Sequence, residues 1–514
     1  MSTERVSASG ADRHGRLLMA SNRLPIVLTR TDTGGWLVEP GSGGLVTALA
    51  PILRDRGGLW IGWTGVAEVP AIELSEPIES ASRDVGYELR PAALSQEEVD
   101  GYYYGFSNEV VWPLFHDLQG RCNFDPAYWR TYQVVNQKFA EAIIANYSPG
   151  DYVWVHDYHL MLVAKELKQR GAKGRFGFFL HTPFPPLDIF VKLPWRLQVL
   201  EALMEYDLIG FQTVRDRNNF LGCVEAFMRG LHPDSRRRLT TVVSEDWRAV
   251  VGSFPISIDF DEFDRMARDP DVIRRRGELR QILPDGQIIL GVDRLDYSKG
   301  IPERLRAYRR ALERFERLRG QTVLVQVVVP SRENIPEYQR LRREIESLVG
   351  EINRSFTQPG WVPVHYIHRS LDRPDLVAYY RAADIALVTP LKDGMNLIAK
   401  EYCAANIDNN GVLILSEFAG AAQQLGRNAL LVNPYHIEAV ADAINRACRM
   451  EPAERESRMR RLRASVRRYD IFWWVRQFLS SAAGKEGEEL PQALGPNLLN
   501  IRPQSWREVR ERVG

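Results

Sequence analysis

Short apolar runs alternate with amphipathic stretches along most of the chain. Nine of these runs have the length and the apolar content of buried strands, at residues 17–21, 152–155, 176–180, 208–211, 288–292, 323–329, 385–388, 412–415 and 430–432. Strands that alternate with helical segments are typical of βαβ units and mainly parallel sheets. The pattern therefore predicts an α/β protein, with the first four strands in one sheet and the last five in another.

The pattern weakens between the two groups of strands, near residue 255. A chain of 514 residues is also too long for a single core, which favours two lobes. We expect a flexible N-terminus at 1–16, a first lobe at 17–255, a second lobe at 256–468, a helix at 469–485 that returns toward the first lobe, and a tail of unassigned role at 486–514. Open α/β sheets bind ligands at the carboxyl ends of their strands, so the cleft between two doubly wound, Rossmann-like lobes is the expected active site.

A segment at 293–300 follows a predicted strand of the second lobe and leads into a helix. Apolar residues follow it with a helical period, at Ile301, Leu305, Tyr308, Leu312, Phe315 and Leu318, and Ser298 is the expected N-cap. Arg294 and Lys299 should therefore lie between a strand end and a helix N-terminus. Two cations and free backbone N–H groups suit the diphosphate of a leaving nucleoside diphosphate.

A second candidate anion site follows the strand at 385–388. Its backbone N–H groups belong to Gly394, Met395, Asn396 and Leu397. Glu401 comes one helical turn later and could accept hydrogen bonds from a ribose, while Asp393 could hold sugar hydroxyls. The structural alternative for Glu401 is an exposed glutamate on a helix surface.

Polar residues also follow two neighbouring strands of the first lobe. Asp157 ends one strand and His181 ends the next, so both should lie on the cleft wall, where a sugar could bind. His156 and His159 lie near them, but no H-x-x-x-H places two ligands on one helix face, and we expect no metal.

Composition narrows the possible partners and compartment. Lys and Arg number 67 against 66 Asp and Glu, so no basic field favours nucleic acid. The cysteines are far apart without a C-x-x-C pair, as expected of reduced thiols in the cytoplasm. Residues 1–16 lack the apolar core of a secretory signal, and no stretch approaches the roughly 20 apolar residues of a membrane span, so no membrane association is expected.

Taken in order, these segments resemble the trehalose-6-phosphate synthases, a family of retaining glycosyltransferases (family 20) with the two-lobed GT-B fold. The resemblance covers about residues 17–480. Its most specific pieces are Ser-Asn-Arg at 21–23, Phe-Ser-Asn at 106–108, His-Asp-Tyr-His at 156–159, the segment 293–300, Asp-Gly-Met-Asn-Leu at 393–397 with Lys-Glu at 400–401, and Ser-Glu-Phe-Ala-Gly-Ala at 416–421.

The resemblance implies roles on the donor side. Arg294, Lys299 and the backbone of 394–397 would hold the donor diphosphate. Glu401 would bind the ribose, and His181 and Asp393 the transferred glucose. The stretch 366–370 is similar to the actinobacterial form of the family, in which the base is contacted mainly by the backbone, so UDP-, GDP- and ADP-glucose all remain open.

The resemblance also implies roles for residues on the acceptor side. The phosphate of glucose 6-phosphate would be gripped by Arg23, Tyr103, Trp112 and Arg332. Asp157 would contact acceptor hydroxyls, and Gly44, a donor-binding residue, would lie with Trp63 in a loop that closes on the sugars. Arg294, Lys299, His181 and Asp157 form the expected catalytic set.

The family resembles other retaining GT-B enzymes in using no metal or cofactor. In the implied reaction, the acceptor hydroxyl attacks the transferred glucose on the same face from which the nucleotide departs. Two other functions remain open: coupling of a nucleotide-linked cyclitol to an aminocyclitol phosphate, and a non-catalytic sugar-phosphate sensor. A homo-oligomer also remains open.

Overall fold

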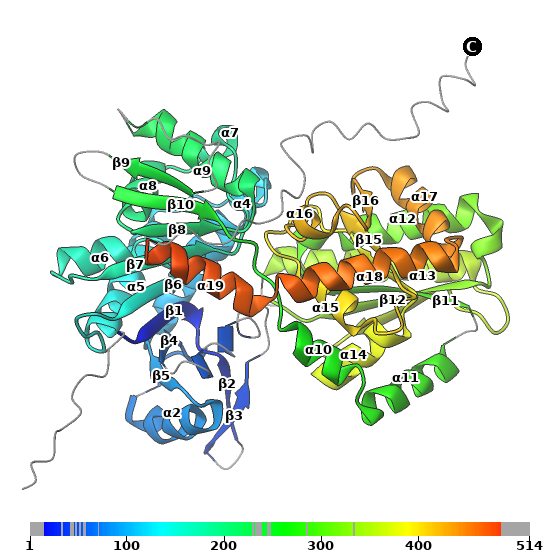
Figure 1. Ribbon diagram of the computed structural model, residues 1–514, viewed down its shortest axis with the longest axis horizontal. Helices are drawn as coiled ribbons and strands as arrows, with labels where there is room; N and C mark the ends of the chain where they lie inside the picture. Colours follow the sequence, from blue (N-terminus) through cyan, green and yellow to red (C-terminus); the bar gives the residue numbers. More distant parts are fainter. Residues whose placement is uncertain are drawn as a thin grey trace, which may run out of the picture.

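A computed structural model describes residues 15–31, 34–41, 46, 49–50, 53–54, 58–69, 71–228, 231, 239–243, 248–283, 286–332 and 335–484. The expected N-terminal segment up to residue 14 and the tail at 486–514 lie outside the described residues. Two α/β lobes lie side by side (Figure 1). At the beginning of the first lobe, Arg16 forms an ion pair with Asp151 at 2.9 Å.

The first lobe is built on an eight-stranded sheet. Its order is β5 (Glu88–Pro91), β4 (Leu59–Trp63), β1 (Leu17–Arg23), β6 (Tyr152–His156), β7 (Arg175–Leu180), β8 (Leu208–Phe211), β10 (Arg248–Ser253) and β9 (Leu239–Val243). All neighbouring pairs are parallel except β10 and β9. A separate antiparallel pair joins β2 (Ile26–Arg30) to β3 (Trp36–Pro40).

Helices of the first lobe connect these strands. They are α2 (Ala71–Val85), α3 (Gln96–Glu98), α4 (Trp112–Phe115), α5 (Pro126–Ile144), α6 (Val163–Gln169), α7 (Leu187–Phe190), α8 (Arg196–Met204) and α9 (Val214–Phe227), with short 3₁₀ turns η2 (Gln119–Arg121) and η3 (Tyr158–Leu160). Between α3 and α4 lies a π-helix, η1 (Val99–Val111). The predicted strands at 17–21, 152–155, 176–180 and 208–211 are confirmed as β1, β6, β7 and β8.

The second lobe is built on a six-stranded, all-parallel sheet. Its order is β13 (Val364–His368), β12 (Thr322–Val329), β11 (Gln287–Arg294), β14 (Ile385–Val388), β15 (Val412–Ser416) and β16 (Leu430–Val432). Its helices and 3₁₀ turns are α10 (Phe260–Met266), α11 (Pro270–Ile282), η4 (Tyr297–Lys299), α12 (Ile301–Arg314), η5 (Glu316–Leu318), α13 (Pro336–Phe356), α14 (Arg373–Ala382), α15 (Leu397–Ala405), α16 (Ala422–Leu425), α17 (Ile437–Cys448) and α18 (Pro452–Arg468). Strands buried on both faces explain the continuous apolar runs in the sequence.

The start of α12 differs from the sequence prediction, because Ser298 is not its N-cap. Asp296 accepts a hydrogen bond from the Ser298 backbone N–H at 2.9 Å and thereby caps the short turn η4. The helix begins after Gly300, which has a φ of 63°. An added Cβ there would lie 2.6 Å from the Thr389 carbonyl oxygen, so glycine suits both the conformation and the space.

The chain returns to the first lobe in its last described helix, α19 (Ile471–Ala482), which lies across the sheet of that lobe (Figure 1). The Trp154 ring stacks on Trp474 at 5.0 Å and on Phe478 at 4.3 Å between centroids. An added Cβ at Gly210 would lie 2.8 Å from the Phe478 ring. The small residue in β8 therefore makes room for the helix. No helix in the described part of the chain has the length and apolar character needed to span a membrane.

Candidate active site

The carboxyl edge of the second sheet joins two segments that are far apart in sequence. Lys299 follows β11, and its Nζ lies 2.5 Å from the Asp393 Oδ2 that follows β14. The other Asp393 oxygen accepts a hydrogen bond from the Met395 N–H at 3.2 Å. Burial alone would raise the pKa of Asp393, but the Lys299 ammonium holds it below the usual value. This ion pair therefore fixes a cation beside the N-terminus of α15.

The loop that leads into α15 lies directly against the first lobe. An added Cβ at Gly394 would lie 2.1 Å from the His181 carbonyl oxygen, so this contact requires glycine. Asn396 has a φ of 58° and caps the helix through a 3.2 Å hydrogen bond from the Ala399 N–H. The backbone at 394–397, predicted to hold the diphosphate, thus lies where the two lobes meet.

Glu401 is buried in α15, with 8% of its surface exposed, so it is not the exposed surface glutamate of the alternative interpretation. Its Oε2 accepts a hydrogen bond from the Tyr380 hydroxyl at 2.8 Å, and burial raises the pKa of its carboxyl group. A fixed carboxylate of this kind suits the recognition of hydroxyl groups.

A buried arginine that the sequence analysis missed supports this edge. Arg304 of α12 pairs with Asp293 at the end of β11. It also donates from Nε to the Thr389 hydroxyl at 3.0 Å and from Nη2 to the Lys299 carbonyl at 3.4 Å. Its position within an apparently ordinary Arg-rich helix gave no signal of burial. Arg304 therefore braces the turn that carries Lys299.

On the first lobe, the structure brings Asp157 and His181 together. The Asp157 N–H bonds the Phe179 carbonyl at 2.8 Å, and its Oδ1 accepts from the His181 N–H at 3.2 Å. Asp157 has a φ of 71° and a ψ of 169°, a backbone conformation rarely adopted by residues other than glycine. Burial raises the pKa of Asp157 to about 6, although three backbone N–H groups oppose the shift.

The imidazole of His181 connects both lobes. Its Nε2 lies 3.1 Å from Nδ1 of His156, and its Nδ1 lies 3.3 Å from the Met395 sulfur of the second lobe. Burial lowers the pKa of His181 to about 3, so the ring is neutral at physiological pH. A neutral ring can act as a hydrogen-bond partner for a sugar without adding charge.

The residues predicted to grip the acceptor phosphate form one continuous cluster. The Arg23 guanidinium lies 4.6 Å from the centre of the Trp63 ring, which in turn is 6.0 Å from the Tyr103 ring. The Arg332 guanidinium, from the second lobe, lies 4.7 Å from the Trp112 ring. Burial alone would raise the pKa of Tyr103, but Arg332 and Arg23 together hold it below the usual value. The cluster therefore places the guanidinium groups of Arg23 and Arg332 beside the Tyr103 hydroxyl, an arrangement that suits a phosphate.

A buried carboxylate holds the two second-lobe arginines of this region. Asp296 Oδ2 lies 3.6 Å from Arg332 Nη1 and 3.7 Å from Arg294 Nη2. Burial would raise the pKa of Asp296, but Arg332 and Arg294 hold it below its usual value. Arg332 also donates to the Tyr338 hydroxyl at 2.6 Å. Sequence reasoning missed Asp296 and Tyr338, although Asp296 lies within the quoted segment 293–300.

The π-helix η1 positions two first-lobe residues of the cluster. Tyr103 lies within it and Trp112 is its C-cap. Gly101 and Gly105 face α5 closely: an added Cβ would lie 2.6 Å from the Thr131 side chain and 2.5 Å from the Tyr128 ring, respectively. π-helical turns often occur at functional sites. Gly44, the remaining predicted residue, lies outside the described residues.

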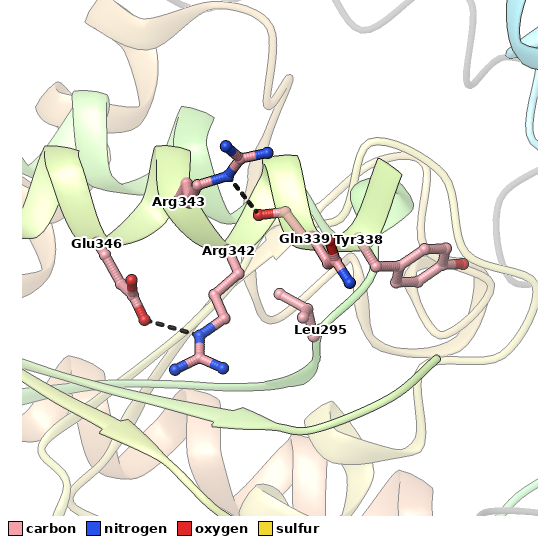
Figure 2. A pocket seen from close by; sticks show the side chains of 6 residues that line it. All are labelled: Leu295, Tyr338, Gln339, Arg342, Arg343 and Glu346. Atoms are coloured by element: carbon pink, nitrogen blue, oxygen red, sulfur yellow. Dashed lines mark hydrogen bonds and ion pairs between the residues drawn. The ribbon is translucent and has the colours of Figure 1, made fainter. Parts of the chain in front are cut away.

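A separate cavity of about 450 Å³ adjoins this cluster. It is lined by Leu295, Tyr338, Gln339, Arg342, Arg343 and Glu346 (Figure 2). Arg342 Nε pairs with Glu346 at 2.8 Å, and the two arginines leave α13 on different sides. None of the residues predicted from the sequence lines this cavity. Within the described residues, no group of three or more His, Cys, Asp or Glu could hold a metal ion.

Two Rossmann-like lobes that meet at the strand ends of their sheets have the GT-B architecture. Glycosyltransferase family 20 matches residues 15–484. The chain therefore belongs to glycosyltransferase family 20 and is a glycosyltransferase. The predicted family, fold class and enzyme class are confirmed.

Similar proteins agree with this assignment over almost the whole chain. Trehalose-6-phosphate synthase of Mycobacterium sp. (strain JLS) is 43% identical over 489 residues, or 93% of this chain and 98% of the relative. The UDP-forming α,α-trehalose-phosphate synthase of Burkholderia xenovorans, solved in complex with glucose-6-phosphate, has a TM-score of 0.82 and 34% identity, covering 91% of this chain and 100% of its own. A structure described as trehalose-6-phosphate from E. coli bound with UDP-2-fluoro glucose has a TM-score of 0.80 and 36% identity, covering 91% and 99%.

Proposed function

We propose that the protein transfers glucose from a nucleoside diphosphate glucose, UDP- or GDP-glucose, to glucose 6-phosphate, giving α,α-trehalose 6-phosphate. The observation that carries this proposal is the cluster of Arg23, Tyr103, Trp112 and Arg332, which combines two cations with aromatic faces at the junction of the lobes. Similar enzymes bound to glucose-6-phosphate and to UDP-2-fluoro glucose support both substrates.

In this proposal, the second lobe (256–468) binds the donor. Arg294 and Lys299 neutralise the diphosphate together with the N–H groups of Gly394, Met395, Asn396 and Leu397. Glu401 binds the ribose hydroxyls, since its carboxylate is fixed by Tyr380 at 2.8 Å. Asp393 and His181, from opposite lobes, bind the glucose that is transferred.

The first lobe (17–255) binds most of the acceptor. Arg23, Tyr103 and Trp112 contact the phosphate, while Arg332 reaches it from the second lobe. Asp157 holds acceptor hydroxyls, and Trp63 and Gly44 belong to the segment that closes on the sugars. Because the acceptor site needs residues of both lobes, it is complete only when the lobes are together.

The reaction proceeds with retention. The acceptor hydroxyl attacks the anomeric carbon on the face from which the nucleoside diphosphate leaves, and a phosphate oxygen of the leaving group takes its proton. Arg294 and Lys299 stabilise the charge that grows on that diphosphate, and such preorganised charges are worth several kcal/mol in comparable sites. The rest of the rate enhancement comes from holding the two sugars in place.

The test is to measure initial rates of nucleoside diphosphate release with UDP-, GDP- and ADP-glucose, each with and without glucose 6-phosphate. A strong acceptor-dependent rate with one donor identifies that donor, and NMR of the product reports whether both anomeric centres are α. Absence of acceptor-dependent release with all three donors contradicts the proposal and favours the coupling of cyclitols. Donor binding without any turnover favours a sensor.

A further inference from the structure

The segment that links the lobes is held from both sides at a single residue. Residues 254–258 are buried and lie between β10 and α10. On the first-lobe side, the Ile256 N–H donates to Oε1 of Gln212, directly after β8, at 2.8 Å. On the second-lobe side, the Ile256 carbonyl accepts from Nζ of Lys400, in α15, at 2.5 Å. Ile256 is therefore clamped between one side chain of each lobe.

The returning chain contacts the same segment. Trp474 Nε1 of α19 donates to the Phe254 carbonyl at 3.0 Å, and the Ile471 N–H donates to the Ile258 carbonyl at 3.0 Å. The two chain crossings between the lobes thus touch each other. Any rotation of one lobe against the other must therefore change the backbone or the contacts of these two segments.

Burial of the Lys400 ammonium group costs desolvation free energy. It is fully buried, and among the residues that the structure describes no carboxylate forms an ion pair with it. Burial lowers the pKa of its ammonium group to about 7. An apolar side chain of similar length would fill the space without the desolvation cost. What the lysine adds is therefore the bond to the linker.

The position of Lys400 connects this bond to the donor site. It precedes Glu401 in α15, the helix whose N-terminal backbone meets the first lobe at Gly394. A change in the orientation of α15 therefore moves the ribose-binding carboxylate, the diphosphate site and the linker together.

We propose that Lys400 is a positioning residue that ties the interlobe linker to the donor-site helix and so keeps the acceptor residues of the two lobes in register. The proposal rests on the proposed function, because it takes α15 as the donor helix. It does not involve contact between Lys400 and either substrate. Loss of the tie should lower the population of the closed arrangement, which weakens binding of any ligand that touches both lobes.

The first measurement is hydrogen–deuterium exchange of residues 254–259 in Lys400→Met, without substrates. We expect exchange about tenfold faster than in the wild type, because opening of the linker becomes easier. Arg463→Met is the control: Arg463 is another buried cation against α15, bonded to the Cys403 carbonyl at 3.0 Å. It also pairs with Asp264 of α10, but no hydrogen bond joins it to the described linker residues. Linker exchange in this control should stay unchanged.

The second measurement separates positioning from general packing. UDP is held mainly by second-lobe residues in the proposed site, so its Kd, measured by calorimetry, should change little between the wild type and Lys400→Met. The KM for glucose 6-phosphate should rise roughly tenfold. The thermal midpoint should change little, because the removal of a buried cation offsets the loss of the hydrogen bond to the buried Ile256 carbonyl.

Unchanged linker exchange in Lys400→Met, or an equal rise in Arg463→Met, would overturn the proposal. If Lys400→Met does not fold, Gln212→Met removes the clamp from the first-lobe side and should give the same faster exchange and raised acceptor KM. Failure of the wild type to turn over any nucleotide glucose would instead contradict the proposed function. The exchange experiment would still decide the role of Lys400, because it needs no turnover.

Discussion

Arg332 is the residue on which the acceptor assignment depends most. Its guanidinium contacts Trp112 and is fixed by Asp296 and the Tyr338 hydroxyl, so it is preorganised to meet an anion. We expect Arg332→Ala to raise the KM for glucose 6-phosphate roughly 10- to 100-fold with a smaller effect on kcat, because its partner phosphate does not react. Steady-state kinetics with varied acceptor measure this. Arg342→Ala, in the neighbouring cavity, is the control and should leave the KM unchanged.

Arg294 should behave differently, because its proposed partner is the leaving group. Its Nη2 lies 3.7 Å from Asp296, and nearly half of its side chain is exposed, so it can follow the diphosphate as charge develops. We expect Arg294→Ala to lower kcat by roughly 100-fold or more while acceptor KM changes little. Rates at saturating donor and acceptor test this. A kcat equal to that of the wild type would remove Arg294 from the mechanism.

Asp157 should leave a signature in the pH dependence of stability. Burial raises the pKa of its carboxyl group to about 6 in the folded state, well above the unfolded value. The folded protein therefore binds this proton more tightly, and lowering the pH from 7 toward 4 should stabilise the wild type relative to Asp157→Asn, by up to about 3 kcal/mol. Urea unfolding of both proteins at several pH values measures the difference. If the difference in unfolding free energy between the two proteins did not depend on pH, the pKa of Asp157 would not be raised in the folded state.

At the scale of elements, the N-terminus of α15 depends on one glycine. A Cβ at Gly394 would meet the His181 carbonyl of the other lobe at 2.1 Å, and backbone cannot move aside easily. We expect Gly394→Ala to lower kcat/KM at least tenfold by holding the lobes apart, while the second lobe remains folded and still binds UDP. Kinetics and calorimetry measure both effects. Gly277→Ala is the control. Gly277 lies in α11, an added Cβ there would meet no neighbouring atom within 4 Å, and the variant should retain full activity.

The elements also show how far the sequence could be read. Many buried parallel strands, such as β11 and β14, were predicted because continuous apolar runs identify them directly. The equally buried parallel strand β4 was missed. The start of α12 was predicted wrongly. Asp296 accepts a hydrogen bond from the Ser298 N–H, and the helix begins only after Gly300, which adopts a left-handed conformation. The π-helix η1 was missed, since its residues carry no period that distinguishes it from an α-helix.

The candidate site was also predicted only in part from the sequence. Residues within motifs were found, and the structure brings Asp157 next to His181 and Lys299 next to Asp393. Supporting residues such as Arg304 and Tyr338 were missed, because their importance comes from burial and from partners distant in sequence. Charge alone could not distinguish Arg304 from the exposed arginines of the same helix.

For the whole molecule, α19 is the element that carries the chain from the second lobe back to the first. Phe478 stacks on Trp154 at 4.3 Å and is fully buried. We expect Phe478→Ala to destabilise the first lobe by roughly 3–5 kcal/mol. Thermal unfolding followed by calorimetry measures this. Phe472→Ala, on the same helix but only partly buried, should cost clearly less, and equal losses would contradict the role of Phe478 in the core.

The docking of α19 also sets an order of events during synthesis. The strands of the first sheet leave the ribosome early, but the helix that covers Trp154 is made only after the entire second lobe. The nascent first lobe therefore carries an uncovered apolar surface around Trp154 while the second lobe is being made, and such a surface aggregates or recruits chaperones. A message truncated before codon 471 would produce a chain in which this surface is never covered by α19.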